Sequence, residues 1–241
     1  MLHLSPPVRN SVGKILATLA CLGGLWAGCA GSAWANYTPP KDADAPSGST
    51  GSSGVRGCLD ASGAMVILAP RSHVGQTTST RPTVSWAMTD TQPFAMQVRL
   101  YQLSHTGERT LVEQLSLETT PGFMQATLPS SQPALEPGHR YLWQVIVLCN
   151  PNRPSSALVD EVEMDVVPLP SGLESALAQV DNPEAQADLY AEAGLWYDAL
   201  AQAIASTNSY DQTLLQELAS IEQATPLGQQ FAEQLRRVMV D

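Results

Sequence analysis

Hydrophobic and polar positions alternate along much of the chain, and near residue 170 the pattern changes to a helical spacing. The longest alternating stretch runs from Leu135 to Cys149, where a Pro-Gly turn leads into a strand that is apolar on both faces. Further short strands, separated by turns rich in Pro and Gly, are expected at 64–68, 82–88, 94–103, 110–117, 122–128 and 158–167. This spacing predicts an antiparallel β-sandwich over residues 58–168.

Beyond Pro170 the apolar residues recur at intervals of three and four, which predicts a small helical unit over residues 171–241. Ser171 and Glu174 have the spacing of a capping box that would begin the first helix. The fold class is therefore α+β, with the strands preceding the helices. Each helix is short and carries few apolar residues, so we expect the helical unit to dock on the sandwich. It would cover the second apolar face of the central strand, which is formed by Leu142, Ile146 and Leu148.

The first 35 residues have the layout of a secretory signal peptide. Arg9 and Lys14 precede an uncharged apolar run, and the small residues Ala33 and Ala35 match a cleavage site. We predict cleavage between Ala35 and Asn36 and export to the periplasm or the extracellular space. The apolar run is shorter than the roughly 20 residues of a membrane span, so no transmembrane segment is expected after signal removal.

Two cysteines in the signal region leave with it, and Cys58 and Cys149 remain. Two thiols in an exported protein predict a Cys58–Cys149 disulfide, between the start of the sandwich and the end of its central strand. The alternative fate of the N-terminus is a lipid anchor at Cys29, because the residues before it resemble a lipobox. Residues 36–57 are rich in Pro, Gly, Ser and Asp, which predicts a flexible linker.

Charge is distributed unevenly along the chain. The sequence has 12 Lys and Arg against 23 Asp and Glu, a net charge of −11, and signal removal changes this to −13. Residues 36–159 hold 8 basic and 8 acidic residues, whereas 15 acidic residues and only two arginines follow from Asp160 onward. This balance excludes nucleic acids and anionic membrane surfaces as partners. We expect the acidic face of the helical unit to bind a basic segment of a protein partner in the cell envelope, or to bind cations.

The nucleotide-binding, metal-binding and nucleophile motifs that accompany enzyme chemistry are absent from the sequence. The histidines of the mature chain are His73, His105 and His139, and none has a partner at a metal-ligand spacing. We interpret all three as surface or turn residues. No catalytic residue, cofactor or metal site is therefore predicted.

Glu161, Glu163 and Asp165 share one face of the strand expected at 158–167. One interpretation is a site for a hard cation such as calcium, and the other is an edge strand protected by charge from pairing with another chain. The second is favoured, because calcium loops cluster their ligands in a turn with glycine. Carboxylates on the helices are interpreted as a solvated face: Asp188, Glu192 and Asp198.

The segment Leu135-Glu136-Pro137-Gly138-His139-Arg140-Tyr141, followed by Trp143, resembles a fibronectin type III or immunoglobulin-like domain. In such domains the tyrosine hydroxyl bonds back to the backbone upstream, so the resemblance implies an immunoglobulin-like sandwich and a tyrosine corner at Tyr141. The residues around Tyr190, Gly194 and Trp196 resemble one tetratricopeptide helical hairpin.

A further resemblance covers nearly the whole mature chain. It is carried by Arg56-Gly57 before a strand, by Leu148-Cys149-Asn150-Pro151-Asn152, and most specifically by the run from Tyr190 to Leu200. Together these resemble the cyanobacterial family called domain of unknown function 928. The family's glycine- and threonine-rich run is reduced here to residues 51–57. The resemblance implies an exported protein without an assigned activity.

Three functions are compatible with these patterns. We expect a non-enzymatic binding or scaffolding protein of the cell envelope. One alternative is a metal-dependent enzyme that uses the acidic strand at 158–167, and the other is a lipid-anchored structural protein of the envelope. A measurement of the metal content of the purified protein distinguishes the metal-dependent enzyme from the expected binding protein. The mass of the mature N-terminus distinguishes the lipid-anchored protein from it.

Overall fold

The computed structural model describes residues 37–47, 58, 65–150, 152–206, 209–224 and 226–239. The predicted signal peptide, its cleavage site at Ala35 and Asn36, and the alternative lipid site at Cys29 lie outside the described residues. Among the described residues, no helix is both long enough and apolar enough to cross a membrane.

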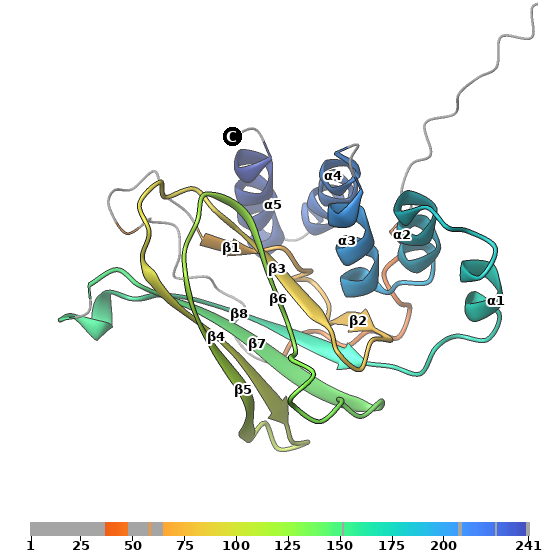
Figure 1. Ribbon diagram of the computed structural model, residues 1–241. Helices are drawn as coiled ribbons and strands as arrows, with labels where there is room; N and C mark the ends of the chain where they lie inside the picture. Colours follow the sequence, from red (N-terminus) through yellow and green to blue (C-terminus); the bar gives the residue numbers. More distant parts are fainter. Residues whose placement is uncertain are drawn as a thin grey trace, which may run out of the picture. The chain divides into compact units, whose positions relative to one another are not determined.

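In the described part of the chain, two β-sheets are followed by five α-helices, so the structure confirms the α+β class with the strands first (Figure 1). The smaller sheet has the order β1-β3-β6 and consists of β1 (Met65–Ile67), β3 (Thr83–Met88) and β6 (Gly122–Thr127). The larger has the order β2-β8-β7-β4-β5 and consists of β2 (Gly75–Thr77), β8 (Leu158–Val166), β7 (His139–Leu148), β4 (Ala95–Leu103) and β5 (Arg109–Glu118). Every pairing is antiparallel except that of β2 with β8.

The central strand β7 pairs with β4 on one side and β8 on the other. Its alternate residues Tyr141, Trp143, Val145 and Val147 enter the hydrophobic core, as the alternation predicts. Trp86 of β3 and Trp143 are both fully buried. The main core therefore lies on the face of β7 that carries these residues.

The prediction that residues 158–167 form an edge strand is wrong. β8 pairs with β7 along its whole length, and β2 pairs with its last three residues, from Met164 to Val166. β2 has only three residues, Gly75, Gln76 and Thr77, which are too few and too polar to show a strand periodicity in the sequence. The long strand at the open edge of this sheet is β5 instead.

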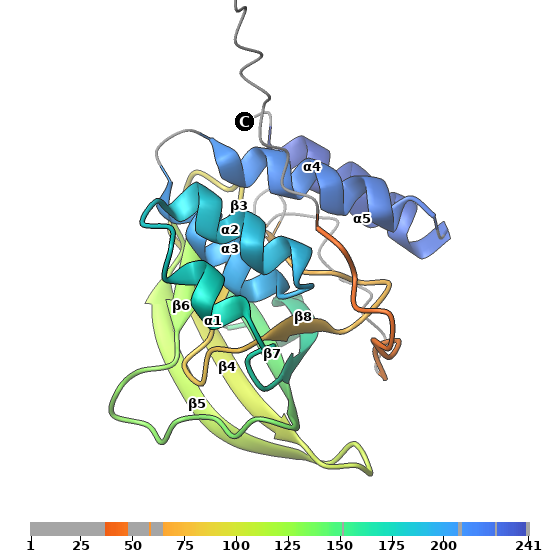
Figure 2. The same ribbon diagram turned by 90° about the vertical axis from the view of Figure 1, so that its right-hand side faces the viewer.

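The five helices are α1 (Leu173–Leu177), α2 (Pro183–Glu192), α3 (Trp196–Ala205), α4 (Tyr210–Glu222) and α5 (Pro226–Val238). The capping box predicted at Ser171 does not form, because Gly172 is the N-cap and no side chain caps the helix. Asn182 caps α2 by accepting a hydrogen bond from the backbone N–H of Ala185 at 2.7 Å. Figure 2 shows α2 against α3 and α4 against α5, in agreement with their packing contacts.

The helices dock on the sandwich through α3, which packs against β2 and β3. Trp196 is fully buried, and its Nε1–H donates to the carbonyl of Leu68 at 2.9 Å. Tyr197 donates from its hydroxyl to the carbonyl of Glu163 at 3.1 Å. Asp198, expected on a solvated face, instead accepts hydrogen bonds from Thr77 and Thr78 at the end of β2.

The docking face differs from the predicted one. Leu142 and Ile146 are buried but do not belong to the main hydrophobic core that the helices share. Alternation along β7 directs them to the outer face of the five-stranded sheet, opposite Trp143 and Val145. The prediction that the helices cover Leu142, Ile146 and Leu148 is therefore wrong, and the outer face forms a separate surface.

Residues 37–47, part of the predicted flexible linker, instead form an arm that packs on the helices and the larger sheet. Tyr37 is only 6% exposed, and its ring meets that of Trp196 edge-on with centroids 4.9 Å apart. The N–H of Thr38 donates to the carbonyl of Ala191 at 3.1 Å. Gly194 has φ 78°, and a Cβ there would lie 3.1 Å from the Thr38 carbonyl oxygen, so only glycine fits this crossing. Residues 48–57 lie outside the described part.

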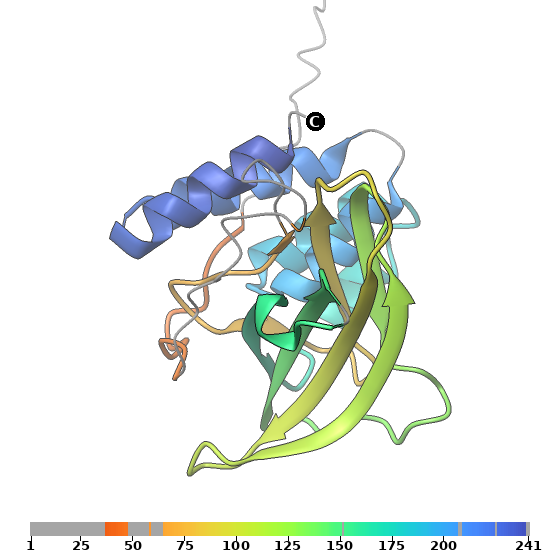
Figure 3. The same cartoon turned by 90° about the vertical axis from the view of Figure 1, so that its left-hand side faces the viewer.

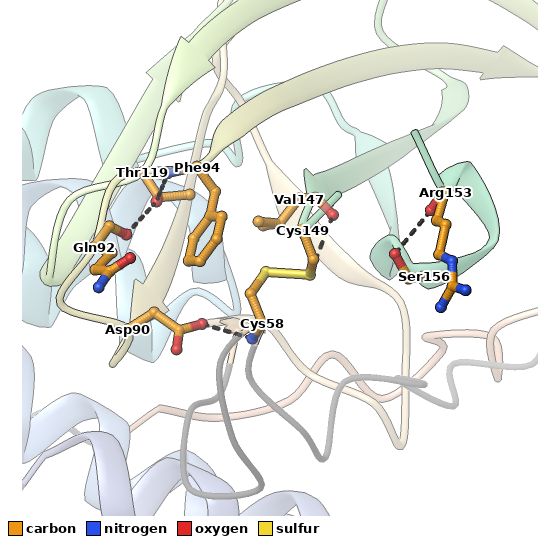
Figure 4. Close-up of a disulfide and its surroundings, with 9 residues drawn as sticks. All are labelled: Cys58, Asp90, Gln92, Phe94, Thr119, Val147, Cys149, Arg153 and Ser156. Atoms are coloured by element: carbon orange, nitrogen blue, oxygen red, sulfur yellow. Dashed lines mark hydrogen bonds between the residues drawn. A yellow bond between two sulfur atoms is a disulfide. The ribbon is translucent and has the colours of Figure 1, made fainter. Parts of the chain in front are cut away.

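The structure confirms the predicted disulfide between Cys58 and Cys149, whose Cα atoms are 5.0 Å apart. Figure 4 shows Phe94 beside the bridge, and the N–H of Cys58 donates to Asp90 at 3.0 Å. The bridge ties the chain before β1 to the end of the central strand.

Candidate functional site

A polar pocket of about 1060 Å³ opens on the outer face of the five-stranded sheet. Its walls come from the arm at Asp44 and Ser47, the β4–β5 turn, the start of β7 and the end of β8. Leu142 is among the few apolar residues that line it. The pocket is therefore formed where two strand ends, one tight turn and the N-terminal arm meet.

Arg140 is the central charged residue of this pocket. Its guanidinium makes a bidentate pair with Asp165 at 2.7 and 2.9 Å, because the two residues face each other across β7 and β8. The same guanidinium lies 3.0 Å from Asp44 and 3.5 Å from Glu163. The hydrogen bond to Asp165 is the main reason why the pKa of Arg140 is raised. Arg140 thus connects the arm to the sheet.

Glu163 anchors the arm to the same surface. It is 4% exposed, and its Oε1 accepts from the backbone N–H of Ser47 at 2.9 Å and from the Ser47 hydroxyl at 2.6 Å. A buried carboxylate needs such partners, because burial without them is costly. The end of the described arm is therefore part of the pocket wall.

Glu161 lies next to the pocket on the same face. It accepts a bidentate pair from Arg109 at 2.8 and 2.9 Å and a further hydrogen bond from Gln144. Burial disfavours the charged carboxylate, but the hydrogen bonds from Arg109 and Gln144 outweigh it and lower the pKa of Glu161. The carboxylate is therefore ionised at neutral pH.

The shared face predicted for Glu161, Glu163 and Asp165 is confirmed by their register with β7. Each of the three carboxylates lies within hydrogen-bonding or ion-pairing distance of an arginine. Within the described ranges, no three His, Cys, Asp or Glu side chains are grouped so that they could hold a metal ion. The carboxylates are instead paired with arginine guanidinium groups. The sequence did not predict these pairs, because the arginines are far from the carboxylates along the chain.

The histidines divide between the pocket and the core. His105 and His139 are exposed and line the pocket, which their isolated positions in the sequence do not predict. His73 lies in the loop before β2, as predicted, but it is 7% exposed and therefore not a surface residue. The Nε2 of His73 lies 2.7 Å from the Tyr37 hydroxyl, and its Nδ1 lies 3.0 Å from the Ser72 hydroxyl.

A second polar cluster is buried where the sandwich meets the helices. Arg71 forms an ion pair with Asp160 at 2.6 Å and lies 4.9 Å from the centroid of the Phe231 ring on α5. Glu222 of α4 is fully buried, and its Oε1 accepts from the backbone N–H groups of Arg71 and Ser72 at 2.9 and 3.1 Å. This cluster joins β8 and the loop before β2 to α4 and α5, so its role is structural.

We predict that acidification destabilises the protein through His73. Burial favours the neutral imidazole and lowers the pKa of His73 below its ordinary 6.5, although Glu222 acts in the opposite direction. The unfolded chain then binds the proton at a higher pH than the folded one, so stability is lost as the pH falls below 6.5. The loss reaches at most about 1.4 kcal/mol per pH unit from this group.

Urea unfolding of wild type and His73→Gln at several pH values between about 7.5 and 5 measures this loss. The difference in stability between the two proteins should narrow as the pH falls. His105→Gln, which changes an exposed histidine, is the control. A constant difference between wild type and His73→Gln would contradict the prediction.

Comparison with models of known protein families gives a match for this chain. A family model described as Domain of Unknown Function (DUF928) matches residues 49–235, which is more than half of the chain and includes both sheets and most of the helical unit. A search of curated proteins finds no match.

Proposed function

The chain belongs to the family described as Domain of Unknown Function (DUF928), and because this description names no activity, we propose a function from the geometry of the pocket itself. The protein is a non-enzymatic binding or scaffolding protein of the cell envelope, and the pocket around Arg140 is its binding surface. The observation that carries this proposal is the charge arrangement, in which Arg140 holds Asp165, Asp44 and Glu163 around one guanidinium. Such a network presents fixed hydrogen-bonding groups to a partner.

The charge balance of the pocket favours a basic segment of a protein partner. Two arginines, Arg109 and Arg140, line it together with the three carboxylates of Asp44, Glu163 and Asp165. The side chain of Asp44 is 74% exposed, so its carboxylate is accessible at the rim. A lysine or arginine of a partner can approach Asp44 without breaking the pair between Arg140 and Asp165.

Four observations support the envelope location and the domain type. A disulfide between Cys58 and Cys149 is typical of proteins in oxidising compartments. The order β1-β3-β6 and, apart from β2, the order β8-β7-β4-β5 match those expected for strands A, B, E and G, F, C, C′, which supports an immunoglobulin-like sandwich. The Tyr141 hydroxyl also accepts from the Glu136 N–H at 3.1 Å, which supports a tyrosine corner. The packed pair of α2 and α3 supports the tetratricopeptide-like hairpin.

Affinity purification from the native envelope fraction tests the proposed function. Asp44→Asn is expected to reduce recovery of the protein's partner, because it removes the exposed carboxylate while its surface ion pair contributes little to folding. Glu174→Gln, an exposed carboxylate on α1, is the matched control and should recover the partner like wild type. Equal recovery with all three proteins, or recovery that does not depend on salt, would contradict a binding role for this pocket.

A further inference from the structure

β5 is a ten-residue strand whose outer side is open in the described part of the chain. It pairs with β4 only and forms the margin of the five-stranded sheet (Figure 3). Two of its leucines are among the exposed large hydrophobic residues, with Leu111 at 52% and Leu117 at 36%. Edge strands of this length are usually shortened, covered, or protected by Pro or charged side chains. β5 has no Pro, and its charged residues Arg109, Glu113 and Glu118 leave the stretch 114–117 uncharged.

The direction of the backbone groups along β5 follows from two hydrogen bonds. The N–H of Thr119 donates to the carbonyl of Phe94 at 2.9 Å, so odd-numbered residues here point their backbone groups toward β4. The N–H of Gln114 is instead occupied by the Glu113 side chain at 2.7 Å. Alternation therefore directs the N–H and C=O groups of Gln114, Ser116 and Glu118 outward.

A β-bulge limits the regular part of this edge. The register with β4 shifts between Leu100 and Tyr101, which leaves Val112 as the additional residue of β5. Bulges interrupt strand pairing, so the segment available to another strand is 113–118. Within it, Leu115 and Leu117 face the sandwich side, and Gln114 and Ser116 face the outer side.

We propose that a second copy of this chain pairs with β5 in antiparallel fashion, about a two-fold axis at Ser116. In this register Leu115 lies opposite Leu117 of the partner subunit, and Gln114 lies opposite Glu118 of the partner subunit. Once the Glu113 side chain releases the Gln114 N–H, the three outward-facing residues of each copy form about six inter-strand hydrogen bonds. Apolar residues meet on one face and an amide meets a carboxylate on the other, with no like charges directly opposite.

The placement of charge favours a second copy as the occupant. Residues 36–159 are balanced, with 8 basic and 8 acidic residues, whereas the acidic excess follows Asp160. The acidic helices reach the sheet through α3 on β2, which lies at the opposite margin from β5. At about 4.8 Å per strand, the two β2 strands of such a dimer are roughly 40 Å apart. This exceeds the Debye length of about 8 Å at physiological salt several-fold, so the acidic helices do not oppose the pairing.

The oligomeric mass in solution, measured by light scattering on the oxidised protein, tests the proposal. Wild type should be a dimer in concentration-dependent exchange with monomer. Leu117→Lys places a charge within the paired segment and should weaken the dimer by about tenfold or more. Leu111→Lys changes the other exposed leucine of β5, which lies before the bulge, and should leave the dimer unchanged. A wild type that stays monomeric at every attainable concentration, or a Leu117→Lys protein that remains as dimeric as wild type, would overturn the proposal.

Cysteine cross-linking tests the register with variants at exposed polar positions. Residues of a hydrogen-bonded antiparallel pair have Cα atoms about 5.5 Å apart, within the range of a disulfide. Ser116→Cys faces its own copy across the axis and should give a covalent dimer on oxidation. Gln114→Cys lies about 13 Å from its counterpart, four residues along the strand, and should not. This register would be overturned if Gln114→Cys cross-linked as efficiently as Ser116→Cys, or if neither variant gave a covalent dimer.

Discussion

Replacing Arg71 with methionine is expected to lower the free energy of unfolding by about 3–5 kcal/mol. The ion pair between Arg71 and Asp160 has side chains only 6% and 1% exposed. Without the guanidinium, Asp160 remains as a buried carboxylate, and its hydrogen bonds from other described residues are those from the backbone N–H groups of Ile67 and Glu161. The carbonyl of Glu161 also loses its donor, Nη1 of Arg71, at 2.7 Å. Breaking one side of a buried pair costs more than the pair contributes, because an uncompensated charge stays behind.

Arg109→Met is the matched control for this prediction. Arg109 pairs with Glu161, the residue after Asp160, on the opposite face of β8, with side chains 41% and 24% exposed. Water can solvate both partners there, so the expected loss is at most about 1 kcal/mol. Urea unfolding monitored by tryptophan fluorescence measures both variants. Equal losses in Arg71→Met and Arg109→Met would show that burial does not determine the strength of these pairs.

Removing the disulfide is expected to cost about 4–5 kcal/mol. Cys58 and Cys149 are separated by 91 positions, and closing a loop of this length lowers the conformational entropy of the unfolded chain. The double variant Cys58→Ser/Cys149→Ser should therefore unfold at a much lower denaturant concentration than the oxidised wild type. Both proteins should keep the same sheets, because the bridge lies before β1 and after β7, outside both strands.

Reduction provides the control for the disulfide. A thiol reductant should lower the stability of the wild type toward that of the double variant, and it should leave the double variant unchanged. Free thiols in the oxidised wild type, detected by alkylation and mass analysis, would contradict the bridge. A double variant as stable as the oxidised wild type would contradict its contribution to stability.

Local patterns predict much of the β structure. Alternation along β7 identifies Tyr141, Trp143 and Val145 as core residues, since a strand sends successive side chains to opposite faces. The change to helical spacing after Pro170 likewise predicts the helical unit over residues 171–241, which contains α1 to α5. The Cys58–Cys149 bridge follows from counting, because only two cysteines remain outside the predicted signal. These features depend on near neighbours or on composition.

The same patterns do not show which element of the fold covers each face of a β-sheet. Leu142 and Ile146 are apolar, but the helices pack against β2 and β3, and the outer face becomes the wall of a polar pocket. Periodicity reports which residues share a face, and the element that packs there depends on contacts between distant segments. The short β2 carries no periodic signal, so the placement of β8 inside the sheet could not be predicted.

Polar pairing is the clearest case in which distance along the chain matters. Glu222 reaches the backbone of Arg71 across 151 positions, and Ser47 reaches Glu163 across 116. Charged residues are usually exposed to solvent, so the sequence alone predicts that each of these carboxylates lies on the surface. Burial of a charge requires a partner, and only the folded chain brings that partner within hydrogen-bonding distance. The pocket around Arg140 therefore follows from the packing of the arm, β7 and β8, while the strands that form its walls follow from the order of apolar residues.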